Sequence, residues 1–240
     1  MKYAILGDIH SNLEGLQAVL KDAEEQEVTH FACLGDLVGY NANPVECLEI
    51  VRSLNCPIVR GNHDHYCGYN NDLSTFQPMA ADVVDWTREQ LSSEQREFLR
   101  SLKFVATEAS FTMVHSTLDT PENWVYVFDP LEAEAHFNYQ TTSICFFGHT
   151  HMPLAFEKTN KIRSGLYNRI KITVGKKYFI NVGSVGQPRD GDPRSAYVIY
   201  DITNHEVTLR RIEYDLSITQ KKILDAGLPN GVAARLAVGR

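Results

Sequence analysis

The chain has 240 residues, of which 43% are hydrophobic and 22% are charged, and its formal net charge is −7 at pH 7. This length suits a single domain over residues 1–240, because hydrophobic cores stop growing near 250–300 residues or so. The acidic balance argues against a surface that attracts nucleic acid or anionic lipid, and every apolar run is far shorter than the ~20 residues of a membrane-spanning helix.

The N-terminus and the cysteines indicate a cytoplasmic protein. The first apolar run turns polar at Gly7 and Asp8, before the core of a signal peptide could form. The five cysteines are an odd number and form no C-x-x-C pair, which argues against a disulfide framework and against a thiolate zinc site.

The first 60 residues alternate between strand and helix patterns. Apolar runs predict strands at residues 3–6, 29–34 and 57–60, and apolar residues at helical spacing predict helices at 12–26 and 44–53. A β-α-β-α-β order implies parallel strands joined by right-handed crossovers. We therefore expect a parallel sheet in this half.

The rest of the chain begins helical and then becomes rich in strands. Residues 77–102 predict a helix with a second segment beginning at Ser93, and shorter helices are expected at 130–136 and 218–226. Residues 227–240 show little amphipathic pattern, and we expect them to be loosely ordered. This order indicates two sheets packed face to face with helices outside. The expected strands cover residues 104–107, 110–115, 143–147, 154–157, 170–174, 178–182, 195–201 and 206–213.

Polar residues that can bind metal follow five of the apolar runs. They occur in the patterns D-x-H, G-D, G-N-H-D, V-H and G-H-x-H. In open α/β sheets ligands bind at the carboxyl ends of the strands, so these side chains should meet at one edge. The candidate metal ligands are Asp8, His10, Asp36, Asn62, His115, His149 and His151.

Seven candidate ligands are too many for one tetrahedral zinc ion. They suit two divalent ions about 3.5–4 Å apart that share a carboxylate, and Asp36 lies centrally enough in the series to be that bridge. An aspartate after a strand is more often a helix cap or a turn residue, so Asp36 alone would indicate little. The whole set at successive strand ends favours a metal centre.

These motifs resemble the five signature blocks of the calcineurin-like metallophosphoesterase superfamily, and they span residues 8–151. The sequence N-V-G-S-V-G-Q-P-R at 181–189 is similar to a turn in the small bacterial and archaeal phosphodiesterase branch, which includes members resembling asymmetric diadenosine-tetraphosphate hydrolases. The resemblance implies a four-layer αββα sandwich of two mixed sheets. It also implies one ion held by Asp8, His10, Asp36 and His151, and another held by Asp36, Asn62, His115 and His149.

A dinuclear centre predicts hydrolysis of a phosphoester. Water between two divalent ions is acidified enough to act as hydroxide near neutral pH and to attack phosphorus. His63, one residue after Asn62, is placed to protonate the leaving oxygen. Asp64 either orients His63 or caps a turn. Arg189 and Tyr40 are candidate substrate-binding residues, with a surface role as the alternative for Arg189. We expect Mn²⁺ first, with Fe, Co²⁺, Ni²⁺ and Zn²⁺ as alternatives.

The second motif, G-D, narrows the range of substrate classes. It reads G-D-L-V-G-Y-N at 35–41 and lacks the Asp-Arg pair of the similar protein phosphatases, which disfavours a phosphoprotein. We expect a phosphodiester or phosphoanhydride of a small nucleotide. Five aromatic residues lie in segments that could stack on its base, although core packing is their more common role. They are Tyr40, Phe76, Trp86, Trp124 and Tyr126.

Two other functions fit the same fold. A nuclease-type phosphodiesterase on DNA or RNA is one, and the net charge of −7 weighs against it. A catalytically silent metal-binding scaffold, similar to the retromer subunit of the family, is the other. Such scaffolds lose ligands or the His63 position, and this chain keeps them all. The β-rich half also offers an edge through which a homo-oligomer can form.

Overall fold

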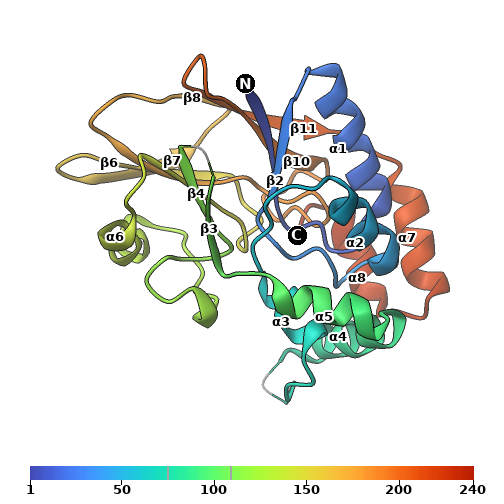
Figure 1. Ribbon diagram of the computed structural model, residues 1–240. Helices are drawn as coiled ribbons and strands as arrows, with labels where there is room; N and C mark the ends of the chain where they lie inside the picture. Colours follow the sequence, from blue (N-terminus) through green and yellow to red (C-terminus); the bar gives the residue numbers. More distant parts are fainter. Residues whose placement is uncertain (75, 109) are drawn as a thin grey trace.

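The first of two mixed β-sheets has the N-terminal strand β1 (Lys2–Leu6) as an interior strand, next to an edge strand. The computed structural model describes residues 1–74, 76–108 and 110–240 (Figure 1). β1 pairs in parallel with β2, its partner across helix α1 (Leu13–Glu25), and antiparallel with β10 on its other side. The strand order is β2 (His30–Cys33), β1 (Lys2–Leu6), β10 (Ser195–Asp201), β11 (Glu206–Ile212) and β8 (Arg169–Lys171).

The second sheet holds three parallel strands, β4, β5 and β9, in its middle. Helix α6 (Pro130–Tyr139) makes the crossover from β4 to β5. The order is β3 (Val105–Glu108), β4 (Phe111–Val114), β5 (Ile144–Phe147), β9 (Lys177–Asn181), β6 (Leu154–Lys158) and β7 (Ile162–Leu166).

The two sheets pack against each other, and helices cover both outer faces. Alternation along β1 sends Tyr3 and Ile5 into the core between the sheets, and Ala4 and Leu6 toward the helices. Helices α1 and α2 (Pro44–Ser53) cover the first sheet, and α6 covers the second (Figure 1). This arrangement confirms the expected four-layer αββα sandwich of two mixed β-sheets.

The middle of the chain is helical, as predicted. Helices α4 (Pro78–Gln90) and α5 (Ser93–Ser101) are separated by the expected break, where Ser92 caps α5. They gather with the short helix α3 (Asn62–Gly68) at one end of the sheets (Figure 1). Within the described residues, no helix combines the length and the apolar character that crossing a bilayer requires.

Some predicted elements differ in the structure. The strand expected at 57–60 is reduced to two isolated bridges, Cys33 to Ile58 and Val59 to Lys103, because this segment lies at the rim of the sheet. The strand expected at 170–174 shortens to β8, and β7 was not predicted because four of its five residues are exposed.

The expectation that residues 227–240 are loosely ordered is wrong. Helix α8 (Asn230–Leu236) packs beside α7 (Leu216–Asp225), and it buries Val232, Ala233 and Leu236. These side chains join Tyr40 in one apolar cluster. A seven-residue helix rich in small residues carries too little periodicity to be recognised without the surface it covers.

Candidate metal centre

The structure brings all seven predicted ligands to one edge of the sheets. Asp8 and His10 follow β1, Asp36 follows β2, and His115 follows β4. The pair His149 and His151 follows β5. Asn62 begins helix α3, and its Oδ1 lies 3.2 Å from His115 Nε2.

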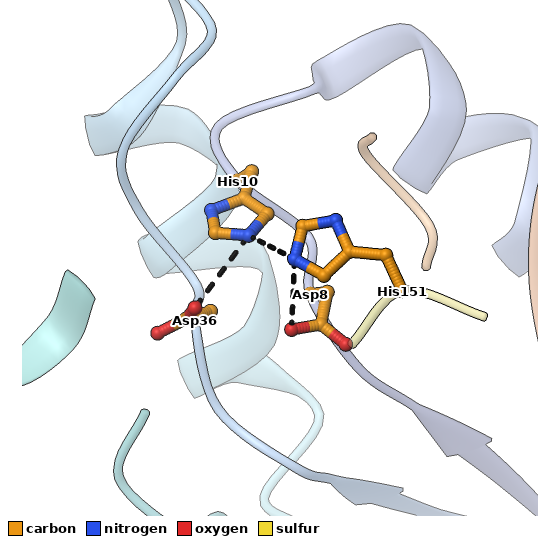
Figure 2. Close-up of side chains that lie close together, drawn as sticks. All are labelled: Asp8, His10, Asp36 and His151. Atoms are coloured by element: carbon orange, nitrogen blue, oxygen red, sulfur yellow. Dashed lines mark hydrogen bonds and ion pairs between the residues drawn. The ribbon is translucent and has the colours of Figure 1, made fainter. Parts of the chain in front are cut away.

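The ligand atoms form two groups that share one carboxylate. Within each group they lie within 4.8 Å of one another, and Asp36 belongs to both groups. Figure 2 shows the first group at the ends of its strands. It consists of Asp8, His10, Asp36 and His151, and the second consists of Asp36, His115 and His149.

Backbone carbonyls fix which nitrogen of each histidine faces the centre. The Nδ1–H groups donate to carbonyl oxygens, from His10 to Val38 at 3.2 Å and from His115 to Leu34 at 2.8 Å. His151 does the same to Gln187, so that Nε2 of all three rings faces the cluster. His149 is reversed, because its Nε2 donates to the Trp124 carbonyl at 2.8 Å and leaves Nδ1 for a metal.

In this arrangement, histidine nitrogens and carboxylate oxygens that each carry a lone pair lie close together. Nε2 of His10 lies 3.0 Å from Nε2 of His151 and 3.5 Å from Asp36 Oδ2, and His151 Nε2 lies 3.4 Å from Asp8 Oδ1 (Figure 2). Buried acceptors that converge in this way need a cation between them. Imidazole nitrogens with carboxylate and amide oxygens suit divalent first-row transition ions, so the donor set fits such ions.

Burial and mutual charge set the protonation of the cluster. Burial holds the pKa values of His10 and His151 well below their ordinary value, and lowers the pKa of His149 to about 3, so that these rings are neutral and can bind metal. Burial would also lower the pKa of His115, but the carboxylates of Asp36 and Asp8 outweigh it and raise the pKa to about 9. A divalent ion held by His115 would take the place of that proton.

The ligand loops are strained. Asp8, His10, Asp36, His149 and His151 all have positive φ angles between 47° and 67°, a region that residues other than glycine rarely adopt. Such strain clusters at functional sites and persists only where the surroundings hold it.

Close backbone packing explains the glycine in the G-H-x-H motif. A Cβ at Gly148 would lie 2.5 Å from Asp8 Oδ2. The Asp8 carboxylate accepts a hydrogen bond from the His149 N–H at 3.0 Å, and the side-chain amide of Asn181 donates to the Gly148 carbonyl at 2.5 Å. This glycine therefore lets two ligand loops meet.

Asp64 positions the backbone of the site and makes no hydrogen bond to His63. Its carboxylate accepts the N–H groups of Asp36 at 2.7 Å, Leu37 at 2.8 Å and Gly61 at 3.0 Å. Of the two roles predicted for Asp64, orienting His63 or capping a turn, these hydrogen bonds match the cap. The same carboxylate also holds the loop that carries Asp36.

His63 stands at the edge of the first ligand group. Its ring centroid lies 4.8 Å from that of His10 and 4.5 Å from that of Tyr40, and its buried Nδ1 has no hydrogen-bond partner among the described residues. Burial lowers the pKa of His63 to about 4, and a phosphate anion beside the ring would raise it by stabilising the imidazolium.

A pocket of about 880 Å³ opens beside the centre, and Asn62 and His149 line it. The predicted residues Tyr40 and Arg189 also line this pocket, where Arg189 donates to the Tyr40 hydroxyl at 3.3 Å. Of the five aromatic candidates only Trp86 lies elsewhere, packed in the cluster beneath Tyr40. The others are Tyr40, Phe76, Trp124 and Tyr126.

Several residues around the site carry no sequence signal. Tyr66 lines the pocket from helix α3, two residues after the G-N-H-D motif, and Arg235 lines it from α8, which carries no motif. The carbonyls of Leu34, Val38 and Trp124 orient histidines through the backbone, so their residue types are not constrained. Only the folded structure identifies them.

The fold and the buried Asp/His cluster together define the class of metal-dependent phosphoesterases. Residues 1–205 match the family model of the calcineurin-like phosphoesterase superfamily domain, and the chain belongs to that superfamily. An uncharacterized protein from Methanocaldococcus jannaschii is 38% identical over 241 residues, which cover 99% of this chain and 98% of that protein.

Two solved structures share the fold. The crystal structure of a metallophosphoesterase from Sphaerobacter thermophilus is 38% identical, with a TM-score of 0.90 over 100% of this chain and 99% of that one. A hypothetical protein from Pyrococcus horikoshii, 20% identical, has a TM-score of 0.83 over 100% of this chain and 98% of its own.

Proposed function

We propose that this chain is a dinuclear phosphodiesterase that hydrolyses a phosphodiester or phosphoanhydride in a small nucleotide. The observation that carries the proposal is the shared position of Asp36, which belongs to both groups of ligand atoms. Two ions that share a carboxylate lie close enough to act on one phosphoryl group.

Each ligand has a role in this proposal. Asp8, His10, Asp36 and His151 would hold one ion, and Asp36, Asn62, His115 and His149 would hold the other, with Mn²⁺ as the first candidate. Two divalent ions bound there would activate a water molecule near neutral pH and neutralise charge on the phosphoryl oxygens.

The remaining steps belong to side chains of the pocket. Arg189 donates to the Tyr40 hydroxyl and the Gln187 side-chain oxygen, a geometry that leaves the rest of its guanidinium for a phosphate oxygen. His63 would protonate the leaving oxygen. The Trp124 and Tyr126 rings, which line the pocket, would stack on a base or its sugar.

Hydrolysis of bis-p-nitrophenyl phosphate tests this function. We expect turnover with Mn²⁺, loss of turnover with a chelator, and recovery when the ion is restored. The monoester p-nitrophenyl phosphate, assayed in parallel, should react more slowly. The variant Asp36→Asn is the matched control, because it should lose both ions and all turnover. A protein that binds two ions and cleaves neither ester would instead be a binding protein.

A further inference from the structure

One wall of the pocket is formed by the C-terminal helix α8 and the start of α4. Arg235 lines the pocket from α8, and Met79 and Ala80 line it from α4. The two helices meet closely, since a Cβ at Gly231 would lie 3.0 Å from Met79 Sδ. Arg235 therefore sits on a packed element, and not on a free tail.

The pocket carries positive charge inside an acidic protein. Two arginines, Arg189 and Arg235, line it, and none of its described lining residues is an aspartate or glutamate, although the net charge of the chain is −7. Within the described residues neither arginine has a carboxylate at ion-pair distance. Six of the other arginines form ion pairs, and three more donate to backbone carbonyls. The paired ones are Arg52, Arg88, Arg169, Arg194, Arg210 and Arg211, and those bonded to carbonyls are Arg60, Arg96 and Arg100.

Part of the pocket wall is aromatic. Tyr66 and Phe76 pack edge to face with centroids 4.5 Å apart, and both line the pocket. A pocket of this volume admits a molecule of nucleotide size, and aromatic walls suit a flat ring.

We infer that Arg235 binds a second phosphate of the substrate, at a distance from the phosphate that is cleaved. The ligand class is a nucleotide that carries one phosphate at the metal centre beside Arg189 and another at the α8 wall, with its base against the aromatic wall. This inference rests on the proposed function and narrows its substrate. Arg235 lies beyond residue 205, where the family match ends, so the second site belongs to the C-terminal helices of this chain.

Calorimetric binding of two matched nucleotides to the Mn²⁺-loaded protein tests the inference. Thymidine 3′,5′-bisphosphate and thymidine 5′-monophosphate differ by one phosphate. We expect the wild type to bind the bisphosphate at least ~10-fold more tightly, as charge-assisted hydrogen bonds allow. Arg235→Gln should remove most of this preference, and Arg235→Lys should keep part of it.

Arg194→Gln is the control variant, because Arg194 pairs with Asp192 outside the pocket, and it should keep the full preference. Thermal unfolding of Arg235→Gln should match the wild type, since the side chain has no ion-pair partner to lose. Equal binding of the two nucleotides by the wild type would overturn the inference, as would a preference that survives Arg235→Gln. If the preference is present but bis-p-nitrophenyl phosphate is not cleaved, the proposed function fails and the second phosphate site stands.

Discussion

Replacement of His63 should reduce turnover without loss of metal, whereas replacement of a ligand should reduce the metal content. His63 belongs to neither group of ligand atoms, so His63→Ala should keep both ions. As a general acid it should matter most for a leaving oxygen that needs a proton. We expect turnover of a dinucleotide to fall about 100-fold or more, and turnover of bis-p-nitrophenyl phosphate to fall much less, because p-nitrophenolate leaves without protonation.

Steady-state rates on the two substrates, with metal content measured by atomic spectroscopy, check this prediction. His205→Asn, in an exposed turn, is the control and should leave both rates unchanged. An equal loss on both substrates would show that His63 does not act as the acid.

Replacement of Asn62, unlike that of His63, should change the metal content of the protein. Its Oδ1 lies 3.2 Å from His115 Nε2, and it is the one predicted ligand of the second ion that is an amide. Asn62→Ala should reduce the metal content from two ions to about one per chain, while the group around His10 keeps its ion. Metal analysis after dialysis measures this, and two ions retained would remove Asn62 from the ligand set.

Among single residues, the sequence indicates which side chains gather in the buried cluster better than it indicates what orients them. Asp8 and His10, which the structure brings together, could be proposed as ligands because metal chemistry demands particular residue types at strand ends. The carbonyl of Val38, which orients His10, could not be predicted, because any residue supplies a carbonyl. Arg235 escaped prediction for a different reason, since its role depends on where a short helix packs.

Among the elements, helix α6 contains a buried histidine that should make stability depend on pH. His136 stacks on Phe179 with centroids 3.5 Å apart, and its Nδ1 accepts the Leu118 N–H at 3.2 Å. Burial lowers its pKa from the ordinary value of 6.5 to about 3. Below pH 6.5, His136 therefore binds a proton in the unfolded chain but stays neutral in the folded chain. Protonation stabilises the unfolded chain, so the free energy of unfolding falls as the pH falls from 6.5 toward 3.

Well below pH 6.5, this residue alone should lower the free energy of unfolding of the wild type by ~1.4 kcal/mol per pH unit. His136→Gln lacks the titrating group, so the stability of the wild type relative to the variant should fall by ~1 kcal/mol from pH 6.5 to 5.5, because the unfolded imidazole is already half protonated at 6.5. Urea unfolding at both values measures it. A difference that stays constant with pH would mean that His136 is protonated in the folded state.

Helix-sized and strand-sized patterns predicted most elements, and the misses have physical causes. The apolar runs of β1 and β10 are buried on both faces and are readable as strands. Strand β7 is mostly exposed and α8 is short, so each depends on its neighbours for its structure. The helix α3 begins inside the N-H-D motif, where metal-site chemistry masks the helical pattern.

For the whole molecule, metal binding should stabilise the fold. The candidate ligands come from both sheets, and their acceptor atoms converge, so an ion bound between them would tie the two sheets together. At Mn²⁺ concentrations near 100 times the dissociation constant, mass action adds about 2.7 kcal/mol. For a domain of this size the melting temperature should rise by roughly 5–10 °C.

Thermal unfolding with Mn²⁺ and with a chelator measures the shift. Asp36→Asn serves as the control, because the loss of the shared carboxylate should abolish most of the shift. The same melting temperature with and without the ion in the wild type would contradict a metal site at these residues.

The interior position of β1 has a consequence for the synthesis of the chain. β1 leaves the ribosome long before its partner β10, because Lys2 pairs with Asp201, so one edge of β1 stays open until β10 has been made. Contacts so distant in sequence make folding slow, and an open apolar edge invites pairing with another chain. Chains that terminate before β10 should therefore aggregate, and this enzyme should depend on chaperones more than a protein of equal stability whose first strand lies at a sheet edge.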